Sequence, residues 1–410
     1  MDSDLSDAVL NMITIQRCGT PITGDFPHPA CHAGRARIWG TDDYLKDCTG
    51  GWHDAGDYGR YVVPGAKAVM DLLLSGRADA LDEARWELDW MLKMQNSDGG
   101  VYHKLTCRDF PGFVMPDQET EELIASPVST AATADFAGVM AFAASIFHEK
   151  RYLVPAMMAY VFLIANPSII PFFNPEGMVT GEYSDSCDKD ERFFASCALY
   201  CATSNPYFMK KARSLYDMDF ASQGDWDCMG IYGLLCLIHS RKRPDLKWNA
   251  KADILSRADE LVCIAELNPF KAALSTYRWG SNMEVTDNGC LLMEAFRISG
   301  KEKYREYAKK QLDYILGNNA QKMSFITGFG EKSPLHPHHR PSEAMGKPMP
   351  GMMVGGPDQH LQDPYALENF KGLEPCMCYA DELASYSTNE VSVYWNASLF
   401  RLITMLENNG

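Results

Sequence analysis

The pattern of apolar positions along the chain is that of α-helices. In eleven segments, apolar residues recur near i, i+3, i+4 and i+7, the spacing that places them on one face of a helix. These segments are 63–74, 78–95, 130–149, 152–165, 188–202, 206–217, 229–240, 250–267, 284–299, 301–316 and 390–406. Allowing for one missed helix, the pattern predicts about a dozen helices and an all-α fold.

Polar and turn-forming residues are concentrated between these helices. Glycine, proline, histidine and aspartate cluster at 18–60, 98–126, 180–190, 276–290 and 324–388. Such loops on a rigid helical frame are typical of a long open cleft. The longest apolar stretch, 152–173, contains Pro155, Pro167 and Pro171, which leave a helix too short to span a membrane. We expect a buried helix there and no membrane partner.

Charge and composition narrow the class of protein. The 410 residues carry a formal charge of −16, with a pI near 5.1. Because no basic stripe is available to neutralise phosphates, we expect no nucleic-acid partner. No linker rich in serine, glycine or proline divides the chain, so we expect one domain over residues 1–410, acting as a monomer.

The thirteen cysteines are an odd number, and the sequence supports no prediction about disulfides. No secretion leader is visible after Met1, so the chain as it stands is expected in the cytoplasm, or outside the cell if a leader precedes it. Cys376 and Cys378 lack a partner pair, which favours a strand-like stretch over a metal site.

The segment GGWHDAGDYGRY, residues 50–61, contains the most informative chemistry. Asp54 and Asp57 are three residues apart in a stretch rich in glycine, so a tight turn can direct both carboxylates at one point. Two such groups can share a water molecule. Glu390, before an apolar helical stretch, is either a second reactive carboxylate or a first-turn residue favoured by the helix dipole.

Together these carboxylates suit one reaction. Inverting hydrolysis of a glycosidic bond needs an acid for the leaving oxygen and a base for water, roughly 6.5–9.5 Å apart. Asp54 and Asp57 supply the base side, and Glu390 supplies the acid.

Three stretches of the chain resemble signature motifs of glycoside hydrolase family nine, the inverting cellulases. Residues 50–61 resemble its base motif. SFITGFGEKSPLHPHHR, 324–340, resembles its histidine signature, and YADELASYSTNEVSVYWNA, 379–397, resembles the signature that contains the acid. The three occur in the family's order and span residues 50–397. The resemblance implies an (α/α)6 toroid, six helical hairpins closed into a ring, with a long substrate cleft built from loops.

The resemblance also implies residue roles. Asp57 is then the general base, Asp54 helps hold the water, and Glu390 is the general acid. His338 and Arg340 are expected to bind the sugar beside the scissile bond, and Asp381 and Tyr386 belong to the acid's signature. Phe194 and Asp358 depart from the family pattern, which more often has tryptophan and asparagine there.

Residues 16–40 resemble the branch of the family that carries zinc and usually follows an immunoglobulin-like domain. The implied ligands are Cys18, Cys31, His32 and His53, the ligand types of a closed tetrahedral site. The alternative is two buried cysteines and two loop histidines. Because His53 directly precedes Asp54, a structural zinc there would also fix the base. We expect no separate immunoglobulin-like or carbohydrate-binding domain within this chain.

A calcium site is a second implied metal site. TGEYSDSCDKDERFFA, residues 180–195, resembles the family's calcium-binding region, with Ser186, Asp190, Glu191 and Asp227 as the matching residues. Calcium needs several oxygen ligands at once. Cys187 interrupts the acidic run, and an acidic helix start is the alternative interpretation.

A glucan cleft should contain aromatic platforms, because the apolar faces of sugar rings stack on flat side chains. Trp279 is the best candidate, followed by Trp52, Tyr58, Tyr386 and Tyr394. Core packing is the alternative for each of them. His103, in VYHKLT, is a further candidate for the cleft.

Three functions are compatible with these sequence features. The first is an endo-β-1,4-glucanase that hydrolyses cellulose and related β-glucans with inversion. The second is an intracellular exo-acting enzyme that trims cello-oligosaccharides, β-glucosides or glucosaminides. The third is a glycan-binding protein on the same ring, which the three carboxylates disfavour. Loop lengths that close the cleft distinguish the first two, and one sequence does not reveal them.

Overall fold

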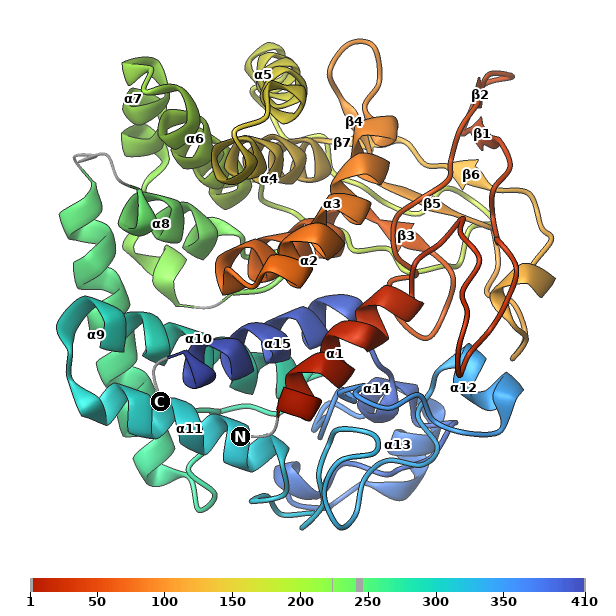
Figure 1. The fold of residues 1–410 in the computed structure, drawn as a ribbon, viewed down its shortest axis with the longest axis vertical. Coiled ribbons are helices and arrows are strands. Elements are labelled where there is room, and N and C mark those ends of the chain that lie inside the picture. Colours follow the sequence, from red (N-terminus) through yellow and green to blue (C-terminus); the bar gives the residue numbers. More distant parts are fainter. Residues whose placement is uncertain (1–2, 223, 241–245, 409–410) are drawn as a thin grey trace.

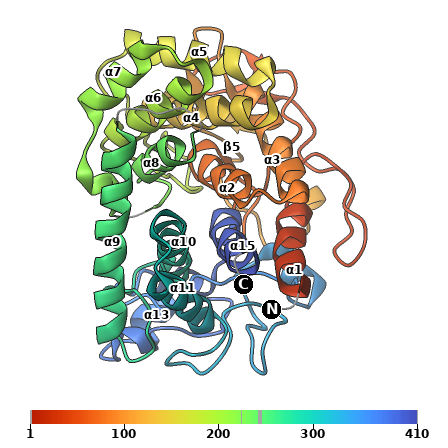
Figure 2. The same ribbon diagram turned by 60° about the vertical axis from the view of Figure 1, so that its left-hand side comes forward.

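The computed structural model describes residues 3–222, 224–240 and 246–408 as a ring of paired helices (Figure 1). The outer helices are α1 (Ser3–Ile15), α3 (Ala78–Met91), α5 (Lys150–Ala165), α7 (Pro206–Leu215), α9 (Lys247–Leu267) and α11 (Glu302–Ile315). The inner helices are α2 (Val62–Ser75), α4 (Thr130–Phe147), α6 (Lys189–Thr203), α8 (Gly230–His239), α10 (Ser281–Ser299) and α15 (Val393–Glu407). Outer and inner helices alternate along the chain, and Figure 2 shows α9, α10 and α11 at one side of the ring.

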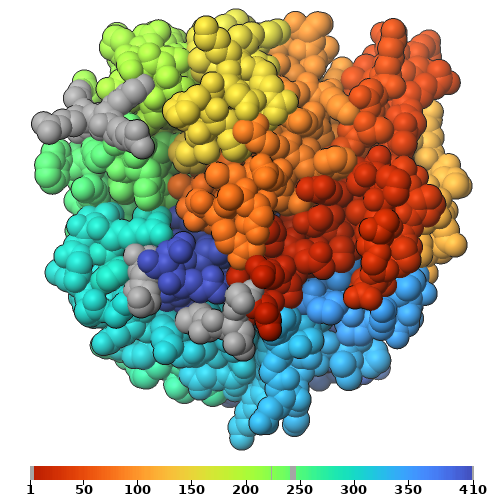
Figure 3. All heavy atoms as spheres, in the orientation of Figure 1, coloured from red at the N-terminus to blue at the C-terminus, as the bar shows by residue number. Residues whose placement is uncertain are grey.

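The ring closes where the last inner helix packs against the first, α15 against α2. Both are apolar on nearly every side, and every residue from Val393 to Leu406 is buried. A helix that is hydrophobic all round is stable only when it is enclosed. In space-filling view, the C-terminal part of α15, dark blue, lies at the centre of one face (Figure 3). The expected (α/α)6 ring is therefore confirmed.

The shorter elements lie in the connections of the ring. The short helices are α12 (Arg340–Met345), α13 (Pro364–Asn369) and α14 (Tyr386–Asn389), with single 3-10 turns η1 (Leu92–Met94), η2 (Pro116–Gln118), η3 (Met218–Ala221) and η4 (Pro375–Met377). The strands are β1 (Ala36–Ile38), β2 (Tyr44–Leu45), β3 (Arg60–Tyr61), β4 (Val101–Tyr102), β5 (Lys104–Thr106), β6 (Ile124–Ala125) and β7 (Val128–Ser129). One sheet has the order β2-β1-β6-β5-β3, and β4 pairs with β7. The β3–β5 register places Tyr61 opposite Lys104.

All eleven predicted helices are present, and the twelfth ring helix, for which the prediction allowed, is α1, before the first predicted one. Three details of the predictions were wrong. The helix predicted over 390–406 begins at Val393, so Glu390 is not a first-turn residue. Residues 376–378, predicted as strand-like, instead include the end of η4, which covers Pro375–Met377. The helix expected to be buried at 152–165 is the outer helix α5, which exposes Val154 and Val161.

Within the described residues, one helix is long and apolar enough to cross a membrane. It is α4, and 83% of its apolar window is buried inside the protein. Its packing partners are the neighbouring helices α5 and α6. The thirteen cysteines all lie in described parts of the chain and are unpaired.

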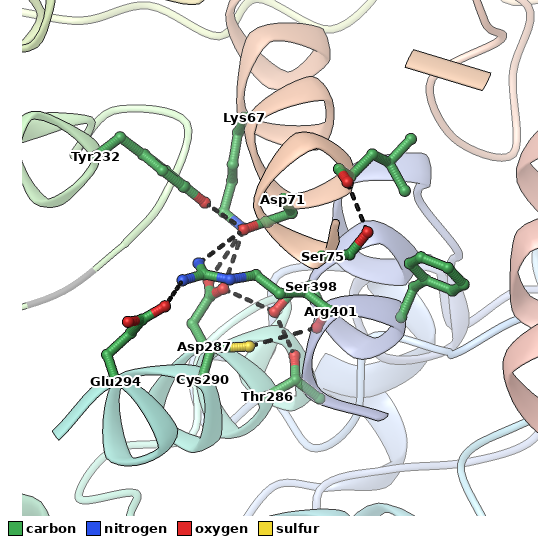
Figure 4. A network of polar contacts seen from close by, with 12 residues as sticks. Lys67, Asp71, Ser75, Tyr232, Thr286, Asp287, Cys290, Glu294, Ser398 and Arg401 are labelled. Carbon is green, nitrogen blue, oxygen red and sulfur yellow. Dashed lines mark hydrogen bonds and ion pairs between the residues drawn. The ribbon is translucent and has the colours of Figure 1, made fainter. Parts of the chain in front are cut away.

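A buried ionic network joins four inner helices at the centre of the ring (Figure 4). Asp71 of α2 accepts hydrogen bonds from Lys67 at 3.0 Å, from Tyr232 of α8 at 2.9 Å and from Arg401 of α15 at 3.2 Å. Arg401 also binds Glu294 of α10 at 3.0 Å. The network therefore connects helices from both ends of the chain.

Candidate active site

The loop over residues 50–61 lies against the loop that contains His338 and Arg340. At Gly56 the two backbones are so close that a Cβ atom would lie 2.1 Å from the carbonyl oxygen of His338. The Gly56 carbonyl accepts hydrogen bonds from the backbone N–H of Arg340 at 3.1 Å and from its Nη1 at 2.9 Å. Only glycine fits this approach, which explains the glycine between the two aspartates.

Asp54 and Asp57 are both buried and each accepts a tyrosine hydroxyl. Asp57 Oδ2 accepts from the backbone N–H of Gly59 at 3.0 Å and from Tyr61 at 3.2 Å. Asp54 Oδ2 accepts from Tyr183 at 2.5 Å. Burial, followed by the charge of Asp57, raises the pKa of Asp54 to about 8, and the Tyr183 hydroxyl opposes the rise. Burial also raises the pKa of Asp57, which the charge of Arg340 opposes.

Glu390 lies between α14 and α15, in an extended link that pairs with the neighbouring loops. Its carbonyl accepts from the N–H of Gly355 at 2.9 Å, and it forms a parallel bridge with His338. The backbone of Asp54 is tied to the same place, because its carbonyl accepts from the N–H of Val393 at 2.7 Å. Burial, followed by the charges of Asp57 and Asp54, raises the pKa of Glu390 well above its usual value. A carboxyl in this position favours its protonated form.

The three carboxylates line one cavity of about 690 Å³. Its wall comes from loops at one end of the inner helices, and contains Asp54, Asp57, Tyr61, Phe110, Glu182, Tyr183, Asp225, Trp226, Arg278, Trp279, His338, Arg340, Tyr386, Glu390 and Tyr394. The structure therefore brings together residues that are more than three hundred positions apart in the chain. It also adds side chains that the motifs did not reveal, including Tyr61, Tyr183, Asp225, Trp226 and Arg278.

His338 and Arg340 both line the cavity, as the resemblance implied. His338 Nδ1 donates to the carbonyl of Leu383 at 2.7 Å. This hydrogen bond fixes the orientation of the imidazole ring. Burial lowers the pKa of His338, so the imidazole is neutral in the cleft at neutral pH. Arg340 donates from Nε to the carbonyl of Pro111 at 2.9 Å and stacks near Phe110.

Trp279 and Tyr386 form the aromatic part of the cavity wall. Their ring centroids are 5.7 Å apart, and His338 lies 5.7 Å from Tyr386. Tyr394 lines the cavity as well. Trp52 does not: it is 3% exposed, and its indole N–H donates to Glu83.

Three further candidates support the site from outside. Tyr58 is buried and donates to the carbonyl of Val114. Asp381 accepts from the backbone N–H groups of Leu335 and His336 at 2.7 and 2.8 Å, and so holds the loop that leads to His338. His103 is fully buried, with its ring stacked on Phe172 at 4.1 Å. The expectation that His103 reaches the cleft was wrong, because it is buried between β4 and β5, where Ser129 and the Glu182 carbonyl hold its ring, and it does not line the cavity.

Cys18, Cys31, His32 and His53 converge in the geometry of a metal site. Their ligand atoms all lie within 4.8 Å of one another. The two sulfurs are 3.9 Å apart, Cys31 Sγ is 3.5 Å from His53 Nε2, and Cys18 Sγ is 3.7 Å from His32 Nδ1. A tetrahedral zinc with its usual bond lengths requires edges of about 3.8 Å between sulfurs and about 3.6 Å between sulfur and nitrogen. The donor set fits zinc in type and in spacing.

The surroundings of this group support the same conclusion. His32 Nε2 lies 2.9 Å from a carboxylate oxygen of Glu119, the kind of outer partner that orients a metal-binding histidine. The backbone N–H of His53 donates to Gln16 at 2.8 Å, and the Gln16 amide donates to the Ala55 carbonyl at 3.0 Å. The residues on both sides of Asp54 are thereby fixed to this cluster.

The expected calcium ligands form a buried acidic group, extended by a residue that the sequence did not indicate. Both carboxylate oxygens of Glu191, both of Asp135 and one of Asp227 are buried without a hydrogen-bond donor in the described part of the chain. Asp190 accepts from the N–H of Gly230 at 3.1 Å. Burial and neighbouring carboxylates raise the pKa values of Glu191 and Asp135. Ser186 is exposed, and Asp190 and Asp227 are half-buried. Buried carboxylates without a donor are costly unless protons or a cation neutralise them.

An (α/α)6 ring with paired carboxylates across an aromatic-lined cavity defines a glycoside hydrolase. The sequence profile named glycosyl hydrolase family 9 matches residues 3–403. A cellodextrinase of Butyrivibrio fibrisolvens is 36% identical over 95% of this chain and 81% of its own length.

Solved structures agree with this match. A thermostable endoglucanase from Alicyclobacillus acidocaldarius, a D468A mutant, superposes with a TM-score of 0.94 at 36% identity, over 98% of this chain and 84% of that one. A Zn-binding triple mutant of the family 9 endoglucanase J30 has a TM-score of 0.92 at 30% identity, with the same coverage. The chain belongs to glycosyl hydrolase family 9, and it is an inverting glycoside hydrolase.

Proposed function

We propose that this protein is an endo-β-1,4-glucanase that hydrolyses cellulose and related β-glucans with inversion. The observation that carries the proposal is the convergence of Asp54, Asp57 and Glu390 in one aromatic-lined cavity. The names of similar proteins, endoglucanase and cellodextrinase, indicate the same substrate class.

The environments of the carboxylates support the roles that we propose for them. Glu390 is half-buried and faces two carboxylates, which favours the neutral acid that protonates the leaving oxygen. Asp57 faces Arg340 and accepts two hydrogen bonds, which favours the carboxylate that removes a proton from water. Asp54, held by the Tyr183 hydroxyl, shares the water with Asp57. Water then attacks the sugar on the face opposite the leaving group, which inverts the anomeric configuration.

The cavity wall assigns the sugar contacts. Trp279 and Tyr386 offer flat apolar faces for stacking with pyranose rings. His338 and Arg340 offer hydrogen bonds to the hydroxyl groups beside the scissile bond, and the charge of Arg340 strengthens its bonds. The protein's own side chains therefore supply both the stacking and the polar contacts that a glucan chain needs.

We infer that Cys18, Cys31, His32 and His53 hold a structural zinc ion. When bound, zinc cross-links the N-terminal segment to the base loop and has no open coordination position. The link to His53 fixes the backbone next to Asp54. For the acidic group of Asp190, Glu191 and Asp227, we infer calcium, with Asp135 as a further oxygen donor. The support is the buried oxygens that lack a donor, since a buried carboxylate is costly without a counter-charge.

Product analysis on two substrates tests the proposed activity. Internal cleavage of carboxymethylcellulose lowers viscosity quickly, whereas an exo-acting enzyme releases short products from cellopentaose with little loss of viscosity. We expect rapid loss of viscosity and an α-configured initial product by NMR. A β-configured initial product would contradict inversion, and hydrolysis restricted to oligosaccharides would favour the exo-acting alternative.

The unpaired cysteines lead us to propose a reducing compartment, which cell fractionation tests.

A further inference from the structure

Lys104 is a fully buried lysine behind the wall of the active-site cavity. Its ammonium group donates to Asn174 Oδ1 at 2.6 Å, to the Gly181 carbonyl at 2.6 Å and to Thr180 Oγ1 at 3.0 Å. The Thr180 carbonyl is a fourth acceptor, at 3.3 Å. A buried charge is costly unless its donors are satisfied. Here neutral oxygens of Asn174, Thr180 and Gly181 satisfy the donors of the ammonium group. Lys104 therefore fixes the position of residues 180 and 181.

The preceding residue, His103, holds the next carbonyl of the same segment. Its Nε2 lies 3.1 Å from the carbonyl oxygen of Glu182, and its Nδ1 lies 2.9 Å from the hydroxyl of Ser129. Because a carbonyl only accepts, Nε2 carries the proton and Nδ1 accepts from Ser129. Burial, with the charge of Lys104, lowers the pKa of His103 to about 3 and keeps the ring neutral. Two successive residues therefore bind three successive carbonyls, 180–182.

The held segment leads directly to the catalytic aspartates. Gly181 and Glu182 line the cavity, and Tyr183 follows with a positive φ of 49°. That backbone conformation is unfavourable for a non-glycine residue and needs support from its surroundings. Tyr183 is the residue whose hydroxyl donates to Asp54. A shift of residues 180–182 would move this hydroxyl away from the carboxylate.

Lys104 also lies beside the second aspartate. It is the cross-strand neighbour of Tyr61, whose hydroxyl donates to Asp57, and its Nζ lies 5.6 Å from the Tyr61 ring centroid. Burial lowers the pKa of Lys104 to about 7, while the charges of Asp57 and Glu182 oppose that change. Attraction between the ammonium and Asp57 is mutual, so the lysine favours the ionised base.

We propose that Lys104, assisted by His103, is a positioning residue that holds segment 180–182 so that Tyr183 and Tyr61 present their hydroxyls to Asp54 and Asp57. The inference rests on the proposed function, because it uses the assignment of these two aspartates. Other titratable or charged groups near Asp57 are Arg340, Glu119, Asp54, Glu390 and His338. These stay in place when Lys104 is changed.

Two substitutions separate the effect of the hydrogen bonds of Lys104 from the effect of its charge. Lys104→Met removes the hydrogen bonds and the charge, whereas Lys104→Gln removes the charge and keeps two donors. We expect Lys104→Met to lower kcat on soluble β-glucan on the order of 10- to 100-fold, because small misplacements of catalytic groups have effects of that size. KM should change less, because the stacking and hydroxyl contacts remain. Lys104→Gln should recover part of kcat.

The pH profile distinguishes positioning from a purely structural effect. Both variants should shift the acidic limb of kcat/KM to higher pH, since Asp57 loses a nearby cation and its pKa rises. The control is Lys303→Met, which removes a lysine of α11 that pairs with Asp259 of α9 and does not line the cavity. This control variant should have a kcat and an acidic limb of kcat/KM close to those of wild type.

Two results would overturn the inference. One is Lys104→Met or Lys104→Gln with kcat near wild type. The other is a lowered melting temperature of either variant with an unmoved acidic limb. If Lys104→Met does not fold, Lys104→Gln decides by the same two readouts. Failure of the proposed function is a different outcome, because wild-type protein would then not hydrolyse β-1,4-glucan at all.

Discussion

Replacing Glu390 by glutamine tests the assignment of the general acid most directly. The amide has the shape of the protonated carboxyl and cannot donate the proton that the leaving oxygen requires. General acid catalysis contributes on the order of 10²- to 10⁴-fold, which corresponds to about 3 to 5 kcal/mol of transition-state stabilisation. We expect a loss of kcat of that size on cello-oligosaccharides, with little change in KM.

The pKa of Glu390 also predicts how the stability of Glu390→Gln compares with that of wild type as the pH changes. The pKa of Glu390 in the folded protein lies well above 4.5, the ordinary pKa of a glutamate side chain. The protonated carboxyl therefore contributes stability below about pH 4.5, and this is lost as the pH rises through the folded pKa. Glutamine does not titrate. The melting temperature of Glu390→Gln should accordingly equal that of wild type in acid and exceed it increasingly at higher pH.

The assay compares two leaving groups. A dinitrophenyl β-cellobioside needs no acid, because its phenolate leaves unprotonated, so Glu390→Gln should hydrolyse it far better than cellotetraose relative to wild type. The matched control is Glu382→Gln, which changes an exposed glutamate just before α14 and should behave like wild type. Near-normal turnover of cellotetraose by Glu390→Gln, or equal losses on both substrates, would refute the assignment.

Four further substitutions follow from the site. Asp57→Asn should lower turnover as severely as loss of the acid, and added azide should give no retained product, because inversion has no covalent intermediate; a β-configured azide adduct would contradict this. Cys31→Ser should lower zinc content by elemental analysis, and with it melting temperature and turnover together; full activity without zinc would refute the coupling. His338→Ala should reduce kcat/KM with little effect on melting temperature, and a large loss of stability alone would indicate a structural role. Glu191→Gln should abolish stabilisation by added calcium in thermal unfolding, and an unchanged calcium response would refute the cation site.

The sequence predicted the ring well because its helices are strongly periodic. The missed helix, α1, contains Leu5, Val9, Met12 and Ile13 on a buried face, so its signal was present at the very start of the chain. The start of α15 was misplaced because apolar residues continue from Val391 into the helix. Glu390 is extended there because its carbonyl pairs with a neighbouring loop. That contact is long-range and leaves no local pattern.

For the site, motifs located the residues that carry chemistry and missed those that orient them. Tyr183 and Asp135 occur in ordinary contexts, and only the folded ring shows a hydroxyl directed at Asp54 or a carboxylate without a donor. His103 was misassigned because a histidine in a loop-rich region has the same sequence signal whether it lines a cavity or lies behind its wall.

The central ionic network explains how so dispersed a site is held together. Buried ion pairs often add little net stability, and their best-attested use is to specify which elements pack together. Lys67 of α2 reaches Asp287 of α10 at 3.2 Å, and Arg401 of α15 reaches α2 and α10 at once. Lys67 also lies 5.9 Å from the ring centroid of Tyr394, in the cavity wall. A ring closed in another register would leave these charges unpaired, so the network favours the one arrangement in which the loop of Asp54 and the link of Glu390 meet.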